Sequence, residues 1–585
     1  MARKTLPSWP ADGLLFSSSA ANRSATAQLS AVLALLSRIS PEADPEGFLR
    51  LAETARALIR TLLTATAAQR TMNARASRAA AERQRLLSEL EALDAQTQGA
   101  ARALPPESAG LLSRAARRSL VLSSRRLAFT PDERRVIEPL RSLYSRLKSE
   151  MSIRLAPSGV AITESLSASA AESALKNADL PAARRQAFAA VNAWFAEKAP
   201  LFADLLNAIA AVRLAALSRS GMTLPEAAAA DEGVSPKALE AFRRAINAGA
   251  AAVRPALSLQ ARAFLPEASL ATDSRPRLPA ALLWAPPPFL TTPAGLSTFE
   301  GALRCLKAAL SRIAPGASAF IDTEVAGGWV QARSLSGGEG GSWTDEVPGE
   351  RAVAVYADWQ PTLGRAFELA HTFGEAYLRH ALQDDPSLVR RPPAILCETM
   401  GRLFSHALLA HLLSQCEDEA ERKSLLWQAL TRIAKNLLDL PFRARLTEMI
   451  HEERARGYLT GAQFCRLAED AWAQYFGDAT EGCDPYVWAR KVHFYRTETL
   501  NYDWQYAFGF LASVRLFERL ERDGCTACGE TLEAFCRDAA WLDAGALFQK
   551  HLGAEIEDVS FWQEAHEAAL KPLAAAASAA SPTGL

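Results

Sequence analysis

The chain has 585 residues, and its 65 Lys and Arg residues balance its 65 Asp and Glu residues, so the formal net charge is zero. This balance gives no electrostatic signal for a nucleic-acid or anionic-membrane partner, and we expect neither. Hydrophobic residues make up 49% of the sequence, and a composition rich in Ala, Leu, Arg and Glu favours helix. The composition therefore predicts a mostly α protein with two lobes.

Cysteine placement and the N-terminal sequence bear on the cellular compartment. The first cysteine is Cys305, which does not fit a disulfide framework. Cys525 and Cys528 have the spacing of half a metal knuckle, but no second pair accompanies them. No apolar signal-peptide segment follows Met1, and no apolar run of about eighteen residues occurs. We expect reduced thiols and a soluble, cytoplasmic protein.

The first part of the chain, from about residue 29 to 220, has the pattern of long amphipathic helices interrupted at prolines. Residues 48–93 are predicted to form a hairpin of two helices. One helix is expected to begin near Pro181 and another after Pro200, because proline is tolerated in a first helical turn.

An Arg-rich stretch follows the predicted hairpin and contains Arg114, Arg117, Arg118, Arg125, Arg126, Arg134 and Arg135. Such a stretch can attract acidic peptides or RNA, and Arg117 and Arg118 are the residues to neutralise in a test. At zero net charge, the interpretation that we favour is a solvated helix face balanced by acidic residues elsewhere.

The domain division rests on a change in sequence character near residue 220. We predict an N-terminal helical lobe at 1–220, a second helical lobe at 221–572 and a disordered tail at 573–585. Within the second lobe, proline-rich sequence predicts an irregular connection at 270–298, because proline removes backbone donors and blocks the preceding helical turn. A helix is expected next, at 299–313.

A small sheet is predicted within about 318–356, where the hydrophobic period changes. Residues 318–330 and 351–356 are the strand candidates, and the second shows clear alternation of Val353 and Val355. The glycine-rich segment 337–341 between them is expected to be a flexible loop, since it lacks the residues of a phosphate-binding loop.

The segment 367–377 after this sheet has the pattern of an altered zinc-binding helix. In the motif H-E-x-x-H, two histidines one helical turn apart bind zinc, and the adjacent glutamate activates a water molecule. Here His371 is present, Thr372 occupies the glutamate position and Glu375 occupies the second histidine position. Alone, the pattern is also compatible with a core histidine whose ring nitrogens are hydrogen-bonded within the protein and bind no metal.

Other histidines do not restore this motif. His451 is followed by glutamate, but Ala455 stands where a second histidine is needed, and we expect an exposed polar helix end there. His406 and His411 are five residues apart, so they do not share a position on one helix face.

Several downstream segments occur in the order of a known family. They are Val355–Asp358, Leu369–Gly374, Ala394–Thr399, Trp488–Tyr495 and Asn501–Gly509. In this order the C-terminal half resembles the oligoendopeptidase F branch of the thimet-oligopeptidase-like zinc metallopeptidases. The resemblance implies an elongated helical fold with two lobes, a deep internal channel and a small sheet beside the metal-site helix.

The resemblance also implies roles for residues at matching positions. His371 and Glu398 match zinc ligands, and Glu375 stands at the position of the remaining ligand. His493 and Tyr502 match the groups that stabilise the oxyanion formed from a peptide carbonyl, with Tyr506 a neighbouring candidate. The implied ligands are zinc and short peptides in the internal channel.

The departures from the motif weaken the chemistry. The hydroxyl of Thr372 cannot accept a proton near neutral pH, and general-base assistance is typically worth about 10² to 10⁴ in rate. Zinc accepts carboxylate oxygens, so His371, Glu375 and Glu398 can still be a metal site, but two carboxylates make a bound water less acidic. Glu368 lies on the same helix face as His371 and can either act as a base or hold the imidazole without metal.

Three hypotheses follow. The first is a peptide-binding pseudopeptidase with little or no hydrolytic activity. The second is an active oligoendopeptidase that uses a metal site of His371, Glu375 and Glu398. The third is a non-catalytic scaffold whose partner surface lies on the Arg-rich stretch.

Overall fold

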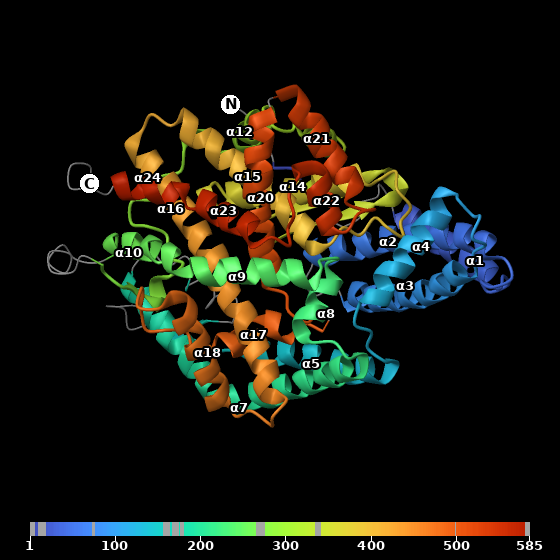
Figure 1. Cartoon of the computed structure of the whole chain (residues 1–585), viewed down its shortest axis with the longest axis horizontal. Coiled ribbons are helices and arrows are strands. Elements are labelled where there is room, and N and C mark those ends of the chain that lie inside the picture. Colours follow the sequence, from blue (N-terminus) through green and yellow to red (C-terminus); the bar gives the residue numbers. More distant parts are fainter. Residues whose placement is uncertain are drawn as a thin grey trace. The chain divides into compact units, whose positions relative to one another are not determined.

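The computed structural model describes residues 6–9, 19–72, 77–155, 164–166, 175, 181–264, 275–333, 341–497, 499–523 and 525–579. Most of these residues are helical, and the strands are short (Figure 1). The predicted mostly α fold is confirmed.

The chain divides into two compact units by its internal contacts. Unit 1 comprises Met1–Arg125, Thr292–Gln415 and Ala512–Ala554, and unit 2 comprises Arg126–Thr291, Cys416–Leu511 and Glu555–Leu585. The units alternate along the sequence, and both sides of residue 220 belong to unit 2. The division into lobes at 1–220 and 221–572 stays a prediction.

Unit 1 contains four N-terminal helices, a central part with the small sheet, and helices from near the C-terminus. Its elements are α1 (Ser19–Leu36), α2 (Pro45–Met72), α3 (Ser77–Ala103), α4 (Leu111–Arg125), η2 (Ala294–Leu296), α12 (Phe299–Leu310), α13 (Pro315–Ala326), β4 (Val330–Gln331), β5 (Ser342–Val347), η3 (Pro348–Glu350), β6 (Ala352–Ala357), α14 (Leu363–Ala381), α15 (Ala394–Gln415), α21 (Cys525–Asp538) and α22 (Ala544–Leu552). Helices α1 to α4, blue in Figure 1, pack in sequence order. The predicted helix pair at 48–93 corresponds to α2 and α3.

The small sheet of unit 1 has the strand order β4-β6-β5. β4 runs parallel to β6, with Val330 opposite Val355, and β5 runs antiparallel to it. Every residue of β6 is buried, and α14 packs against β5 and β6. The strand predicted at 351–356 is therefore confirmed, and the sheet supports the helix that carries His371.

The strand predicted at 318–330 is wrong for most of its length, because Pro315–Ala326 forms α13. Its buried residues are Ala317, Phe320, Ile321 and Glu324, a spacing of three and four residues that marks one helix face. Proline in the first turn also favours the helix.

Unit 2 is built around long helices. Its elements are α5 (Pro131–Ser149), β1 (Ile153–Leu155), β2 (Glu164–Leu166), α7 (Pro181–Ser220), α8 (Leu224–Asp231), α9 (Pro236–Val253), α10 (Pro255–Arg262), β3 (Leu278–Pro279), η1 (Ala280–Leu282), α16 (Glu419–Ala434), the π-helical segment η4 (Lys435–Asp439), α17 (Leu440–Arg454), α18 (Gly461–Phe476), β7 (Thr480–Glu481), α19 (Val487–Arg490), η5 (Val492–Tyr495), α23 (Val559–Ala569) and α24 (Lys571–Ala579). Helix α20 (Trp504–Asp523) begins in unit 2 and ends in unit 1.

Three further sequence expectations can be compared with these elements. The two helices predicted from Pro181 and after Pro200 are one continuous helix, α7. Residues 275–298 contain only short elements, in agreement with the predicted irregular connection. The tail predicted as disordered from residue 573 is helical to Ala579 in α24, which packs against α16. The predicted glycine loop at 337–341 lies mainly outside the described residues.

Among the described residues, α7 alone is long and apolar enough to cross a membrane by length and composition. More than half of its most apolar window, 56%, is buried within the protein. Phe195, Phe202 and Ile209 on this helix are fully buried, which is typical of a core helix.

Candidate functional site

Helix α14 places His371 and Glu375 one turn apart on the same face. The helix begins after Thr362, whose side chain accepts a hydrogen bond from the Arg365 backbone N–H. The imidazole Nε2 of His371 lies 3.1 Å from Oε1 of Glu375. Because residues four apart are neighbours on a helix surface, this contact is local and is set by the sequence spacing.

Helix α15 brings Glu398 to the same place because two glycines let α14 and α15 approach closely. A Cβ atom at Gly374 would lie 2.3 Å from the Met400 carbonyl oxygen, and one at Gly401 would lie 2.5 Å from the His371 ring. With this close packing, Glu398 Oε2 lies 3.7 Å from His371 Nε2. One ligand atom from each of His371, Glu375 and Glu398 lies within 4.8 Å of the others.

Positive charges surround these carboxylates. The Arg402 Nη2 atom lies 3.4 Å from Oε2 of Glu398, one helical turn away. Burial opposes ionisation of Glu375, but its hydrogen bond with His371 and the charges of His371, Arg379 and Arg402 outweigh burial and lower its pKa. Glu375 is therefore ionised at neutral pH. The neighbouring arginines partly compensate for the charges of Glu375 and Glu398 without a metal ion.

Thr372 occupies the general-base position of the motif, and its hydroxyl is engaged with the helix backbone. Its side chain is buried, and its hydroxyl donates a 2.8 Å hydrogen bond to the backbone carbonyl of Glu368. The Glu368 carboxylate lies 2.6 Å from Nη1 of Arg365, which also contacts Asp358 at 3.1 Å. Each carboxylate that could replace the missing base is thus held by a cation or by His371.

The donor set fits a divalent zinc ion by ligand type and by the two separations from His371. Zinc binds imidazole nitrogen and carboxylate oxygen, and tetrahedral ligands at about 2.0–2.1 Å lie roughly 3.3 Å apart. The measured separations from His371 Nε2, 3.1 Å to Glu375 and 3.7 Å to Glu398, are close to that value. A bound ion would compete with Arg402 for the Glu398 carboxylate.

A second cluster contains the predicted oxyanion donors and lies in unit 2. His493 is in η5, Tyr502 follows it in a loop, and Tyr506 is in the first turn of α20. The ring centroids of His493 and Tyr502 are 5.4 Å apart, and those of Tyr502 and Tyr506 are 5.2 Å apart. The guanidinium of Arg496 lies over the Tyr502 ring at 3.9 Å, a cation–π arrangement.

The orientation of His493 is set by a buried ion pair. Its Nδ1 lies 3.0 Å from Oδ1 of Asp503 and 2.9 Å from Nη1 of Arg443. Asp503 is 1% exposed; burial opposes its ionisation, but the Arg443 charge and the His493 hydrogen bond lower its pKa. The Arg443 guanidinium can only donate, so where Nδ1 accepts from it, the proton of a neutral ring is on Nε2; a neutral ring that instead donates from Nδ1 to Asp503 has a lone pair on Nε2. The arrangement in which Nδ1 accepts from Arg443 makes Nε2 a donor.

The structure adds charged residues that the sequence reasoning missed. Asp503 is adjacent to Tyr502, so its proximity to the motif was a usable signal. Arg443 comes from α17, and no local pattern links it to His493. Arg402 lies four residues after Glu398 on α15, a spacing that does predict an ion pair.

The predicted site residues fall in the two units. His371, Glu375 and Glu398 lie together in unit 1, and His493, Tyr502 and Tyr506 lie together in unit 2. A single site formed by both clusters stays a prediction.

Other candidate residues have structural partners or lie outside the described side chains. Arg117 donates to the Ser108 carbonyl oxygen, and Arg118 lies 2.8 Å from Asp543, so both are engaged within unit 1. The expected exposed position of His451 is wrong: the residue is 4% exposed, because α17 packs against other helices of unit 2. The side chains of the Cys525–Cys528 pair are outside the described part of the chain.

Comparisons with known proteins identify the fold. No protein-family model matches the chain, and no curated protein matches its sequence. A solved protein assigned as a peptidase from Chlamydophila abortus is 16% identical, with coverage of 98% of both chains and a TM-score of 0.75.

Two further structures agree. PZ peptidase A with an inhibitor is 14% identical over 94% of this chain and 97% of that chain, with a TM-score of 0.71. Oligoendopeptidase F from Enterococcus faecium is 15% identical over 95% of this chain and 91% of that chain, with a TM-score of 0.56.

The protein therefore has a mostly helical peptidase fold. Within that class, the fold is of the oligoendopeptidase F type. At these identities the likeness defines the fold, and the chemistry has to be argued from the residues of this chain.

Proposed function

We propose that this protein binds short extended peptides in an internal channel and hydrolyses them very slowly or not at all. The observation that carries the proposal is Thr372, which occupies the general-base position with a buried hydroxyl bonded to the Glu368 carbonyl oxygen. General-base assistance typically contributes about 10² to 10⁴ to a hydrolytic rate, and a threonine hydroxyl cannot provide it near neutral pH.

The carboxylates near His371 do not replace the missing base in this proposal. Glu368 is paired with Arg365 at 2.6 Å, which holds it in its ionised form and directs it to the guanidinium. Glu375 has a lowered pKa, so it is a weak proton acceptor, and it is already hydrogen-bonded to His371. If zinc binds, His371, Glu375 and Glu398 would hold it, and the ion would supply Lewis acidity.

Peptide recognition is assigned to the second cluster. With Nδ1 accepting from Arg443, the Nε2 proton of His493 is available for a peptide carbonyl oxygen, and Asp503 and Arg443 fix the ring. Tyr502 and Tyr506 add aromatic surface beside it. A donor that stabilises an oxyanion in an active enzyme also binds a ground-state carbonyl, so binding can persist without turnover.

The alternative is an active metallo-oligoendopeptidase, and the ligand spacing of His371, Glu375 and Glu398 is the observation in its favour. In that case Glu368 would have to leave Arg365 to act as the base, or one of the two metal-site carboxylates would have to exchange its ligand role for a base role. The six cysteines described as free thiols suit the cytoplasmic location that we also propose.

One set of measurements separates the two functions. Protein purified without chelator is analysed for bound metals, incubated with a quenched peptide library, and titrated with the same peptides for binding. We expect little metal, no chelator-sensitive cleavage, and peptide binding that weakens in His493→Gln. Stoichiometric metal with chelator-sensitive turnover would establish the enzyme instead, and absence of both binding and cleavage would overturn both functions.

A further inference from the structure

Unit 2 contains an open groove that none of the functions above uses. It has a volume of about 880 Å³ and is lined by the C-terminal half of α7, the turn that leads into α8, and the last turns of α17. One wall is apolar and includes Leu214, Leu217 and Met222. A volume of this size is within the range of small-molecule sites.

The α17 side of the groove includes His451, whose Nε2 atom is a buried acceptor. The Nδ1 atom of His451 lies 2.7 Å from the Thr447 carbonyl oxygen, and because a carbonyl only accepts, Nδ1 must carry the proton. Burial, reinforced by the Arg213 charge, lowers the pKa of His451 to about 3, so the ring is neutral. Nε2 is then an acceptor, and it has no hydrogen-bond partner in the described part of the chain. A buried acceptor of this kind calls for an N–H or O–H donor.

Arg454, one helical turn after His451, lines the same groove. Its Nε atom is buried and makes no hydrogen bond with any described residue. The nearby acidic groups are already paired, since Glu452 lies 2.8 Å from Arg445 and Glu448 lies 2.6 Å from Arg243. Arg454 is thus a cation on this wall that forms no ion pair with Glu448 or Glu452.

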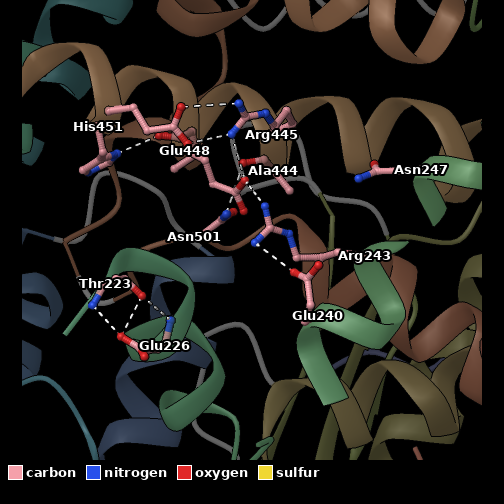
Figure 2. A network of polar contacts seen from close by, with 12 residues as sticks. Thr223, Glu226, Glu240, Arg243, Asn247, Ala444, Arg445, Glu448, His451 and Asn501 are labelled. Atoms are coloured by element: carbon pink, nitrogen blue, oxygen red, sulfur yellow. Dashed lines mark hydrogen bonds and ion pairs between the residues drawn. The ribbon is translucent and has the colours of Figure 1, made fainter. Parts of the chain in front are cut away.

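Arg243 of α9 and Glu448 of α17 form an ion pair that lines the groove, and Figure 2 shows both side chains among the polar contacts of this region. The same two residues also line a cavity of about 30 Å³, together with Asn247 and Asn501. That volume is of the size of a water molecule, so it is too small for a larger ligand.

We propose that this groove binds small amphipathic carboxylates that carry an N–H donor next to the carboxylate, the class that includes N-acylated apolar amino acids. The carboxylate pairs with Arg454, the N–H donates to His451 Nε2, and the apolar side chain contacts Leu214 and Met222. Residues three apart on a helix have Cβ atoms about 5–6 Å apart, which suits two adjacent polar groups of one small molecule. The proposal shares no residue with the peptide-binding function and does not depend on it.

The probe is N-acetyl-leucine, titrated calorimetrically into the full-length protein. Two analogues each lack one feature: 4-methylpentanoate has no N–H donor, and N-acetyl-leucine amide has no carboxylate. We expect N-acetyl-leucine to bind with a dissociation constant of roughly 1 mM or tighter, and each analogue to bind roughly 10-fold or more weakly.

Two variants assign the binding to this groove. Arg454→Gln should weaken N-acetyl-leucine binding by roughly 10-fold or more, and Arg456→Gln, an exposed arginine paired with Glu453, should leave it unchanged. His451→Asn keeps a donor toward the Thr447 carbonyl and removes the Nε2 acceptor, so it should weaken N-acetyl-leucine but not 4-methylpentanoate.

The assignment is overturned if wild-type protein shows no heat of binding at roughly 10 mM probe, well above the expected dissociation constant. Equal binding by Arg454→Gln and Arg456→Gln overturns it as well. Arg454 is partly exposed at the end of α17, so its substitution is informative even where His451→Asn fails to fold.

Discussion

Substitution of Gly401 by alanine tests whether close helix packing holds the His371 group together. A Cβ atom there would lie 2.5 Å from both Nδ1 and Cε1 of the His371 ring. Ordinary carbon contacts are about 3.5–4.0 Å, so the ring or the helix must move by about 1 Å. A shift of that size takes the 3.1 Å contact between His371 and Glu375 beyond hydrogen-bonding distance.

The expected cost follows from three contributions. Overpacking a dense interior costs about 1–3 kcal/mol, and losing a hydrogen bond to a charged group costs about 1.5–3 kcal/mol. Alanine regains about 1 kcal/mol relative to glycine within a helix. We therefore expect Gly401→Ala to lower the free energy of unfolding by about 3 kcal/mol. Gly374→Ala should cost more, because its Cβ would meet the Met400 backbone at 2.3 Å and no side chain can rotate away.

The assay is urea unfolding, with the His371 ring followed by NMR of labelled histidine. Gly364→Ala is the matched control, because this exposed glycine in the first turn of α14 has no atom within 4 Å of an added Cβ. It should be neutral or slightly stabilising, since alanine is the better helix former. If Gly401→Ala is as stable as Gly364→Ala, and the His371 resonances do not move, the ring is not held by this packing.

Three other predictions address the two clusters and α17. Thr372→Glu with Glu375→His should raise zinc affinity and create peptide cleavage, measured by calorimetry and a quenched peptide library; a folded variant without gain would show that other parts of the machinery are lost. His451 has a folded pKa of about 3, below its unfolded value of about 6.5, so its stabilisation is complete above pH 6.5 and declines below it. Wild-type protein should therefore lose about 2 kcal/mol of unfolding free energy between pH 7 and pH 5 that His451→Asn does not lose. Asp503→Asn should lower the free energy of unfolding in urea by about 3–5 kcal/mol, because the buried guanidinium of Arg443 loses a paired negative charge. Asp439, the other partner of Arg443, is more exposed, so Asp439→Asn should cost less.

The fold was predictable where sequence pattern and environment agree. Residues 48–93 carry a helical hydrophobic period, and residues 351–356 alternate on a buried strand, so both were predicted correctly. At 318–330 the local composition suggested a strand, but Phe320, Ile321 and Glu324 are spaced so that a helix buries all three on one face. Pro200 did not end its helix, because α7 is embedded in unit 2 and tertiary packing outweighs one lost backbone hydrogen bond.

The candidate site was predictable only in part. His371 and Glu375 share one helix, and the resemblance pointed to Glu398, and the structure brings the three side chains together. Their metal-binding role stays a prediction. The contacts that adjust the chemistry come from positions that a linear motif does not include, such as Gly401 beneath the His371 ring and Arg443 behind His493.

The loss of the base and the gain of a carboxylate are physically linked through charge. In the intact motif, a neutral second histidine lets the metal be compensated by one ligand carboxylate and leaves another carboxylate for the water. With Glu375 in place of that histidine, a further carboxylate at residue 372 would add a third negative charge to a group that already holds Glu375 and Glu398. Thr372 avoids that repulsion, and the charges of Arg379 and Arg402 partly compensate for Glu375, the carboxylate gained. In the proposed function, the same exchange therefore stabilises the group without an ion and leaves no proton acceptor for hydrolysis at residue 372.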